Sequence, residues 1–589
     1  MAPRGASLHY RVEAADLHAH LFRVTLSIDQ PAAQQAVSLP VWIPGSYLVR
    51  EFSKNLQRLA ARQDGRAAAV QQLDKHTWQV ECVPSSPLVL TYEVYALDNS
   101  VRTAWLDTHR GFFNGTSLCL KVHGQEQSVH SLELVPGKAT SQWEVATGLA
   151  PHRVGKRGFG TYLAADYDEL VDSPVEMGTF WSAEFKAGGV PHRIVVAGAG
   201  ESFDAARLLA DVHKICETEV RFWHGAGPGR AGKRPPFRSY LFMLNCVDDG
   251  YGGLEHRNST ALIASRRDLP RLGEARIGDG YLTLLGLISH EYFHTWNVKQ
   301  LRPAEFSHYD YSRENYTQLL WFFEGFTSYY DDLLLRRAGV IDDAAYLKLL
   351  NKTINQVLQA PGREVQSVAQ ASYDAWVKYY RQDENTPNAT ISYYTKGALV
   401  ALCFDLTLRA EGRTTLDDVM RALWQRCKAG PMTEADFAGV LKELGGRSFS
   451  REIAAWVHGT RELPLEQLLP LHGVAVLQDP AQLQQRLGLR VSETAGIQVK
   501  TVLRGGAAEQ AGLAANDEWL GVEAGGSGWR MTKLDDLLLY AGAHRKLTVL
   551  AARDRRLLRL ELHLPAAATT WRLALREAAL AQPWLGVQT

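Results

Sequence analysis

Residues 290–294 read His-Glu-Tyr-Phe-His and constrain the fold more than any other part of the chain. They follow an apolar run over residues 280–289, which is typical of a buried helix. Two histidines four positions apart on a helix lie about 5–6 Å apart on one face, where both can bind one metal ion. Burying two imidazoles and a carboxylate costs on the order of several kcal/mol unless each is paired or bound to metal. The pattern therefore predicts a metal site on a buried helix, and argues against solvated side chains on a helix surface.

A third protein ligand is predicted downstream, because a hydrolytic zinc site has three protein ligands and leaves a fourth place for water. Glu324 is the one acid in an apolar and aromatic stretch, residues 319–330. Glu305 and Glu314 are nearer in sequence, but they lie among polar residues typical of a solvated connection. The alternative role for Glu324 is a buried salt bridge to an arginine.

We predict that one Zn²⁺ ion is bound by His290, His294 and Glu324. Cobalt or manganese would suit the same ligand types. Glu291, between the two histidines, is predicted to act as the general base that takes a proton from water and passes it to the leaving amine. The sequence thus indicates a zinc hydrolase. It contains no G-x-S-x-G elbow, and the nearest match, residues 525–528, lies in a different part of the chain.

The metal-site motifs resemble a known family. The pentapeptide followed by Trp-Phe-Phe-Glu-Gly-Phe at residues 321–326 resembles the gluzincin aminopeptidases, and residues 290–299 (HEYFHTWNVK) resemble the glycyl aminopeptidase family in particular. The resemblance implies an aminopeptidase that acts on peptides with a free N-terminus, with glycine or alanine as the expected first residue. The long spacing between His294 and Glu324 implies an inserted loop between two helices.

Residues 252–256 (GGLEH) resemble the G-x-M-E-N element of these aminopeptidases, an edge strand along which the substrate lies. Gly252 and Gly253 would allow the substrate backbone to approach closely, and a free strand edge accepts an extended peptide. By this resemblance Glu255 holds the α-amine of the substrate. The alternative is a glycine turn followed by a solvated Glu-His pair.

Residues 393–400 (YYTKGALV) resemble the element that supplies a catalytic tyrosine in the same enzymes. The match assigns that role to Tyr394, whose phenol would donate to the oxyanion that develops during hydrolysis. Tyr393 is the rival for the role. The alternative for both is aromatic packing at the start of a helix.

Composition limits the partners of the protein. Lysine plus arginine and aspartate plus glutamate number 64 each in 589 residues, so no net charge attracts nucleic acid or an anionic membrane. The six cysteines are widely spaced and form no CxxC pair, which argues against a disulfide framework. No apolar leader or run of eighteen apolar residues occurs. We therefore expect a soluble cytoplasmic protein without nucleic-acid or membrane partners, and the oligomeric state stays open.

The chain is long enough for several domains, and we predict a multidomain α+β protein. Alternating apolar residues predict an all-β sandwich over residues 1–185. Mixed strands and long helices over residues 186–465 suit a thermolysin-like catalytic domain. Within the first domain, residues 42–50 (WIPGSYLVR) match a segment typical of the glycyl aminopeptidase family and are predicted to border the cleft. A Pro-Gly turn between strands is the alternative for this segment.

Residues 475–565 form the third predicted domain, and residues 566–589 a C-terminal tail. A strand over residues 496–502, followed by AAEQAGL at 507–513 and NDEWLGV at 516–522, resembles a PDZ domain, which the glycyl aminopeptidase family carries at its C-terminus. PDZ domains bind extended peptide ends by strand addition. The resemblance implies a peptide ligand, although the predicted groove loop departs from the usual GLGF.

Two other functions remain open from the residues alone. A zinc endopeptidase would use the same metal site without a role for Glu255. A scaffold protein would keep the peptidase fold as a relic and use the PDZ-like domain for its biological role.

Overall fold

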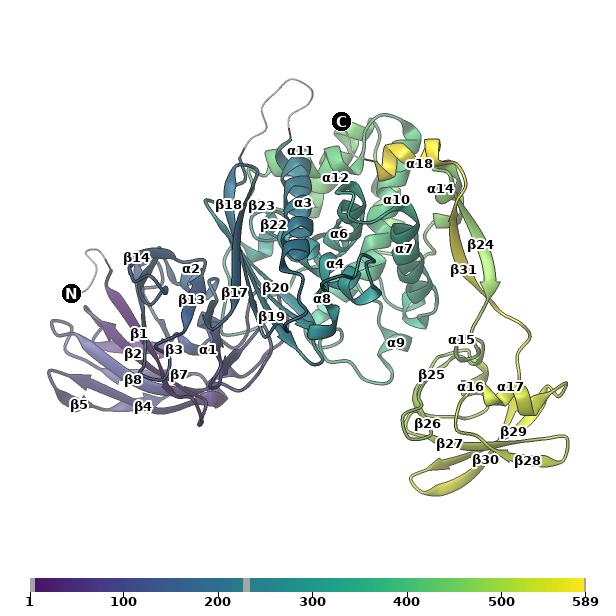
Figure 1. Cartoon of the computed structure of the whole chain (residues 1–589), viewed down its shortest axis with the longest axis horizontal. Helices are drawn as coiled ribbons and strands as arrows, with labels where there is room; N and C mark the ends of the chain where they lie inside the picture. Colours follow the sequence, from purple (N-terminus) through teal and green to yellow (C-terminus); the bar gives the residue numbers. More distant parts are fainter. Residues whose placement is uncertain (1–5, 226–233, 587–589) are drawn as a thin grey trace.

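The computed structural model describes residues 6–225 and 234–586. It has three parts: an N-terminal domain of β-sheets, a central domain that joins a sheet to a large helical lobe, and a smaller β-sheet domain near the C-terminus (Figure 1). The predicted multidomain α+β class is confirmed at this level. No helix in the described part of the chain is both long and apolar enough to cross a membrane.

The N-terminal domain follows the alternation seen in its sequence. Phe22, Val24, Leu26 and Ile28 all have no exposed surface, because alternate side chains of a strand point to the same face. Side chains from three sheets share one core.

The largest sheet has the strand order β14 (Ala150–Val154), β15 (Gly160–Ala164), β12 (His130–Val135), β1 (Leu8–Asp16), β2 (Leu21–Ile28), β8 (Leu88–Tyr95), β4 (Leu56–Gln63) and β5 (Arg66–Ala68). The second sheet has the order β13 (Glu144–Thr147), β16 (Val175–Gly178), β10 (Arg110–Phe113) and β9 (Ala104–Leu106). The third has the order β11 (Lys121–Val122), β3 (Gln34–Ser38), β7 (Thr77–Glu81) and β6 (Val70–Gln72), and two short helices, α1 (Gly115–Leu118) and α2 (Tyr167–Val171), join the strands.

The change from the first to the second domain falls earlier than the predicted boundary at residue 185. That residue lies inside β17 (Trp181–Ala187), which pairs along its whole length with β18 (Val190–Ala197) of the central sheet. Hydrogen bonding therefore places the boundary between β16 and β17.

The central domain is built on a mixed sheet with the order β17, β18, β19 (Tyr240–Val247), β21 (Ser259–Ser265) and β20 (Tyr251–His256). The inner strand β19 pairs in parallel with both neighbours and is buried along nearly its whole length. The edge strand β20 runs antiparallel to β21, and Leu254 on it packs into the core of the N-terminal domain. β20 thus lies between the two domains, and no strand of the described residues pairs with its other edge.

Helices cover the rest of the central domain. They are α3 (Ala205–His224), α4 (Asp279–Phe293), α5 (Leu320–Phe323), α6 (Gly325–Arg337), α7 (Asp343–Leu358), α8 (Val368–Tyr373), α9 (Thr386–Ala389), α10 (Thr395–Glu411), α11 (Leu416–Arg426), α12 (Glu434–Gly445), α13 (Ser450–Trp456) and α14 (Leu465–Leu471). Helix α4 packs against α3, α6, β20 and β21 and so lies at the centre of the domain.

The long connection between α4 and α5 fixes the N-terminal domain beside the central one. The backbone N–H of Val41 donates to the carbonyl of Tyr311 at 2.9 Å, and the Trp42 indole donates to the Asp310 carbonyl at 2.8 Å. The Tyr311 hydroxyl in turn donates to Asp168 of α2 at 2.8 Å. The expected inserted loop therefore acts as an interdomain contact.

The C-terminal domain is inserted into a two-stranded ribbon. The ribbon pairs β24 (Val474–Pro480) with β31 (Thr569–Leu575), and the domain between them has its own core (Figure 1). Its elements are α15 (Leu483–Leu487), β25 (Leu489–Ser492), β26 (Ile497–Val502), α16 (Ala507–Gln510), β27 (Glu518–Ala524), β28 (Ser527–Arg530), α17 (Asp536–Ala541), β29 (Lys546–Arg553) and β30 (Arg556–His563).

The segment that we assigned to a C-terminal tail carries defined elements. After β31, helix α18 (Ala578–Leu585) returns to the helical lobe, and Trp584 is fully buried there (Figure 1). The Trp584 indole donates to the Tyr329 hydroxyl at 2.9 Å, and Arg337 donates to the Trp584 carbonyl at 3.0 Å. The chain therefore closes on the helical lobe; residues 587–589 lie outside the described residues.

Candidate metal centre and substrate cleft

Helix α4 delivers the two histidines at its C-terminal end. Leu282, Leu285 and Ile288 bury one side of the helix in the core of the domain. His290 lies in the last turn and His294 is the C-cap residue, still with right-handed helical backbone angles. Because the helical path continues through His294, both imidazoles project from the same face.

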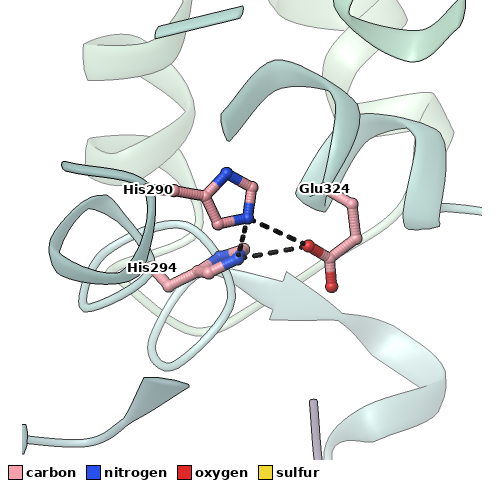
Figure 2. Close-up of side chains that lie close together, drawn as sticks. All are labelled: His290, His294 and Glu324. Carbon is pink, nitrogen blue, oxygen red and sulfur yellow. Dashed lines mark hydrogen bonds and ion pairs between the residues drawn. The ribbon is translucent and has the colours of Figure 1, made fainter. Parts of the chain in front are cut away.

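Glu324 reaches the histidines from the break between α5 and α6. Its Oε2 atom lies 3.1 Å from His294 Nε2 and 3.6 Å from His290 Nε2, and the two Nε2 atoms are 3.0 Å apart (Figure 2). Glu324 and His294 are each 2% exposed. The three predicted ligands converge, and their ligand atoms lie close enough to share one ion.

The hydrogen bonds behind the imidazoles indicate which ring nitrogens face the ion. His290 Nδ1 lies 3.0 Å from a carboxylate oxygen of Asp331, and His294 Nδ1 lies 2.7 Å from the carbonyl oxygen of Asn297. Both partners only accept hydrogen bonds, so each Nδ1 carries the proton. In the neutral rings both Nε2 atoms then present lone pairs to each other and to the Glu324 carboxylate. This donor set fits a divalent cation with nitrogen and oxygen ligands.

The charges at the site favour an ionised Glu324. Burial alone would raise the pKa of its carboxyl, but the positive charge of His294 and His290 in their protonated forms outweighs that effect and lowers the pKa to about 2. A cation held between the neutral rings would favour the ionised carboxylate in the same way. A carboxylate that stays ionised in a buried place is a suitable ligand for a cation.

Glu291 lies beside the three ligands and is 5% exposed. Burial, reinforced by the nearby charge of Glu255 and opposed by the imidazoles, raises the pKa of Glu291 to about 7. A general base is most effective when its pKa is near the working pH. The Glu291 carboxylate lies against Gly253 of β20 so closely that a Cβ atom there would overlap it.

Glu255 also lies beside this group. It is 4% exposed, and its carboxylate forms a second close group with Glu291 and His294. Gly45 of the N-terminal domain lies against it, because a Cβ atom at Gly45 would be 2.6 Å from the Glu255 oxygens. The predicted border segment, residues 42–50, therefore walls the Glu255 end of the cleft. Gly252, the remaining predicted substrate residue, lies on the same edge strand.

The two candidate tyrosines differ in what they contact. The Tyr394 ring lies 6.2 Å from the His290 ring, on the metal side of the cleft. Tyr393 has no exposed surface, and its hydroxyl is buried without a hydrogen-bond partner in the described part of the chain. Of the two tyrosines, Tyr394 is the one whose ring lies near a metal ligand.

The sequence analysis missed the groups that orient the histidines. Asp331 stands seven residues after Glu324 on α6, two helical turns away on the same face, and that spacing was the available signal. The Asn297 carbonyl gives no signal in sequence, because any residue supplies a backbone oxygen.

Comparisons with known proteins agree with this geometry. Residues 9–179 match the Peptidase M61 N-terminal domain, and residues 283–400 match the M61 glycyl aminopeptidase. An aminopeptidase N family protein from Idiomarina loihiensis, known from its crystal structure, is 36% identical with a TM-score of 0.92, over 98% of this chain and 100% of that one. The chain belongs to the M61 glycyl aminopeptidase family. It is a metallo-aminopeptidase, as the family and the resemblance of its motifs both indicate.

More distant structures also align with this M61 family member. An M1 zinc metallopeptidase from Deinococcus radiodurans is 15% identical, with a TM-score of 0.47, over 79% of this chain and 97% of that one. A comparison with curated proteins found no match.

Proposed function

We propose that the protein is a zinc-dependent aminopeptidase that removes a small N-terminal residue, glycine or alanine, from peptides. The observation that supports this most is the convergence of His290, His294 and Glu324 next to Glu291, beside the unpaired edge of β20. The choice of glycine or alanine comes from the family to which the chain belongs.

Different residues of the chain would carry out different steps of the hydrolysis. A divalent cation held by the three ligands would supply Lewis acidity at the scissile carbonyl and lower the pKa of a water molecule. Glu291, buried beside the three ligands, would take the proton from that water and deliver it to the leaving amine. Tyr394 would donate a hydrogen bond to the oxygen on which negative charge develops.

Glu255 would give the enzyme its preference for a free N-terminus. A buried carboxylate favours a protonated amine, and Gly45 lies against it, so a longer chain would meet the wall of the N-terminal domain. The substrate would lie along β20 with its amine at Glu255.

The test measures bound metal and the hydrolysis of a panel of aminoacyl amides. We expect about one zinc per chain and the fastest turnover on the glycine and alanine amides. Glu291→Gln should keep the metal and lose about 10²–10⁴-fold in kcat, whereas Glu314→Gln, at a half-buried acid on the loop between α4 and α5, should behave as the native chain. A metal-loaded native protein that cleaves no free-amine amide would overturn the proposal.

N-acetylated peptides separate an aminopeptidase from an endopeptidase. We expect acetylation to abolish cleavage and Glu255→Gln to raise KM for free-amine substrates, because both remove the pairing of amine and carboxylate. Equal cleavage of acetylated and free peptides would favour the endopeptidase.

We also propose that residues 475–565 form a PDZ domain. Its sheet order, β25, β26, β27, β29 and β30, leaves β25 at an edge, which suits strand addition by an extended peptide. Isothermal titration of the native protein with a library of peptide carboxylates tests this, and binding that survives amidation of the peptide C-terminus would contradict it.

A further inference from the structure

Two arginines of the N-terminal domain lie near the edge strand β20 and the segment that borders Glu255. Arg102, in the connection between β8 and β9, donates from Nη2 to the carbonyl of Gly253 at 3.1 Å. Its Nη1 atom would be 3.5 Å from a Cβ atom at Gly252. Arg102 thus reaches from the N-terminal domain to the unpaired edge of β20.

Arg50 ends the border segment, residues 42–50, whose Gly45 lies against Glu255. Its Nη2 atom donates to the Ser46 hydroxyl at 2.6 Å. Burial and the neighbouring charge of Arg102 lower the pKa of Arg50 to about 10. The two guanidinium groups are therefore near enough to repel each other.

Neither arginine is neutralised within residues 6–225 and 234–586. Neither forms an ion pair there, and the Nε–H group of each is buried without a hydrogen-bond acceptor. Asp98, an acid that attracts Arg50, is exposed and beyond ion-pair distance. Two positively charged, half-buried arginines whose Nε–H groups are buried without an acceptor are costly to maintain, and an anion would satisfy both.

The direction in which a bound peptide would run along β20 indicates which part of it lies near Arg50 and Arg102. A peptide with its amine at Glu255 and its backbone along β20 runs back toward Gly253 and Gly252, past the metal ligands. Residues of an extended chain advance about 3.4 Å each, so a di- or tripeptide spans roughly 7–10 Å. Its C-terminal end would therefore reach the edge that Arg102 contacts.

We propose that Arg50 and Arg102 bind a carboxylate of the substrate on the leaving-group side of the scissile bond, and that the preferred substrates are di- and tripeptides whose free C-terminus supplies it. This inference rests on the proposed aminopeptidase function and specifies its substrate class. Arginine suits the role, since its planar fork matches the two oxygens of a carboxylate.

The native, metal-loaded chain provides the first test. We compare kcat/KM for Gly-Ala and Gly-Ala-Ala with the same peptides amidated at the C-terminus, and with Gly-Asp amide. A charged hydrogen bond predicts that the free acids are better substrates by roughly tenfold or more, mainly through KM. Equal kcat/KM for acids and amides overturns the subsite while leaving the aminopeptidase intact; cleavage of none of them overturns the proposed function instead.

The Gly-Asp amide distinguishes the source of the carboxylate. A low kcat/KM for Gly-Asp amide, like that of Gly-Ala amide, supports the C-terminus as the group that the arginines bind. A kcat/KM equal to that of the free acids supports an anion subsite but overturns its assignment to the C-terminus.

Variants test the arginines themselves. Arg102→Gln and Arg50→Gln should each reduce the acid-to-amide ratio of kcat/KM toward one. Arg102→Lys keeps the charge and should retain part of the ratio, and Arg62→Gln, at an exposed arginine of the same domain, should retain all of it. A full ratio in folded Arg102→Gln and Arg50→Gln proteins, checked by circular dichroism, overturns the assignment to these residues.

Discussion

Each imidazole of the metal group is oriented by a second hydrogen bond, and the two bonds differ in kind. Asp331 offers His290 a carboxylate, whereas Asn297 offers His294 a backbone carbonyl. A carboxylate makes the ring a stronger ligand as well as fixing its direction. The metal affinity of the site therefore depends on a residue that does not touch the ion.

Asp331→Asn should weaken metal binding by about 10- to 100-fold, because the amide no longer holds the His290 proton as strongly. Competition with a chromophoric chelator measures the change. Asp332→Asn is the matched control, since the Asp332 side chain makes no hydrogen bond or ion pair within the described residues. Equal affinities for the native chain and Asp331→Asn would show that the orienting bond has no effect.

Gly253→Ala should abolish turnover while the metal stays bound. The added methyl group would occupy the place of the Glu291 carboxylate, so the base must move from its position beside the ligands. Turnover of glycine amide and metal content are measured together. Gly278→Ala is the control, because a Cβ atom at that glycine meets nothing within 4 Å; turnover by Gly253→Ala at the native rate would contradict the geometry.

Site residues that are close together in the sequence could be predicted from their spacing, whereas those that come from distant parts of the chain could not. His290, Glu291 and His294 share one helix, so their spacing alone specified their arrangement. Glu324 followed from its isolation in an apolar stretch. Arg102 could not be predicted, because it reaches β20 from another domain and nothing in its local sequence differs from that of a surface arginine.

Helix α4 is tied to the central sheet by a buried histidine. His192 on β18 is 1% exposed, and its Nδ1–H donates to the Val190 carbonyl at 2.9 Å. Its Nε2 atom therefore accepts a hydrogen bond from the Tyr292 hydroxyl at 2.8 Å, within the metal-binding pentapeptide. This arrangement requires a neutral ring, and burial lowers the pKa of His192 to about 4.

The stability of the central domain should consequently fall in mild acid. An unfolded histidine has a pKa of about 6.5, so between pH 6.5 and 4 the unfolded chain binds the extra proton and the folded state loses roughly 2–3 kcal/mol. Thermal unfolding midpoints between pH 7 and 4.5 measure the loss. His192→Gln should show a shallower dependence on pH than the exposed-site control His152→Gln, and identical slopes would contradict this role for His192.

At the scale of the whole molecule, the C-terminus stabilises the catalytic lobe. Trp584 is fully buried against Tyr329 and Arg337, although it follows an inserted domain. From the sequence, residues 566–589 were predicted to form a C-terminal tail, but they carry β31 and α18. The packing of this segment depends on how β31 leads the chain back to the helical lobe. No local sequence pattern predicts that.

Trp584→Ala should destabilise the catalytic lobe by about 3–5 kcal/mol, the usual cost of emptying a large buried site. Urea denaturation followed by the loss of turnover measures it. Trp529→Ala, at a tryptophan that is 45% exposed in the inserted domain, should cost much less. Equal effects of the two substitutions would contradict the anchoring role of α18.

The inserted domain should be removable without loss of the metal site. Pro480 and Thr569 face each other at the end of the ribbon, so a short Asn-Gly turn can join β24 to β31 in place of residues 481–568. We expect this protein to fold and to bind one metal ion, as measured by metal analysis and thermal unfolding. Loss of metal on excision would show that the domain contributes to the catalytic lobe.

Anomalous diffraction at the zinc absorption edge from crystals of the native protein locates the bound metal ion among its ligands. We predict one peak, about 2.0–2.2 Å from His290 Nε2, His294 Nε2 and a carboxylate oxygen of Glu324. A peak between Glu255, Glu291 and His294, the other close group of ligand atoms, or no peak after zinc loading, would contradict the account.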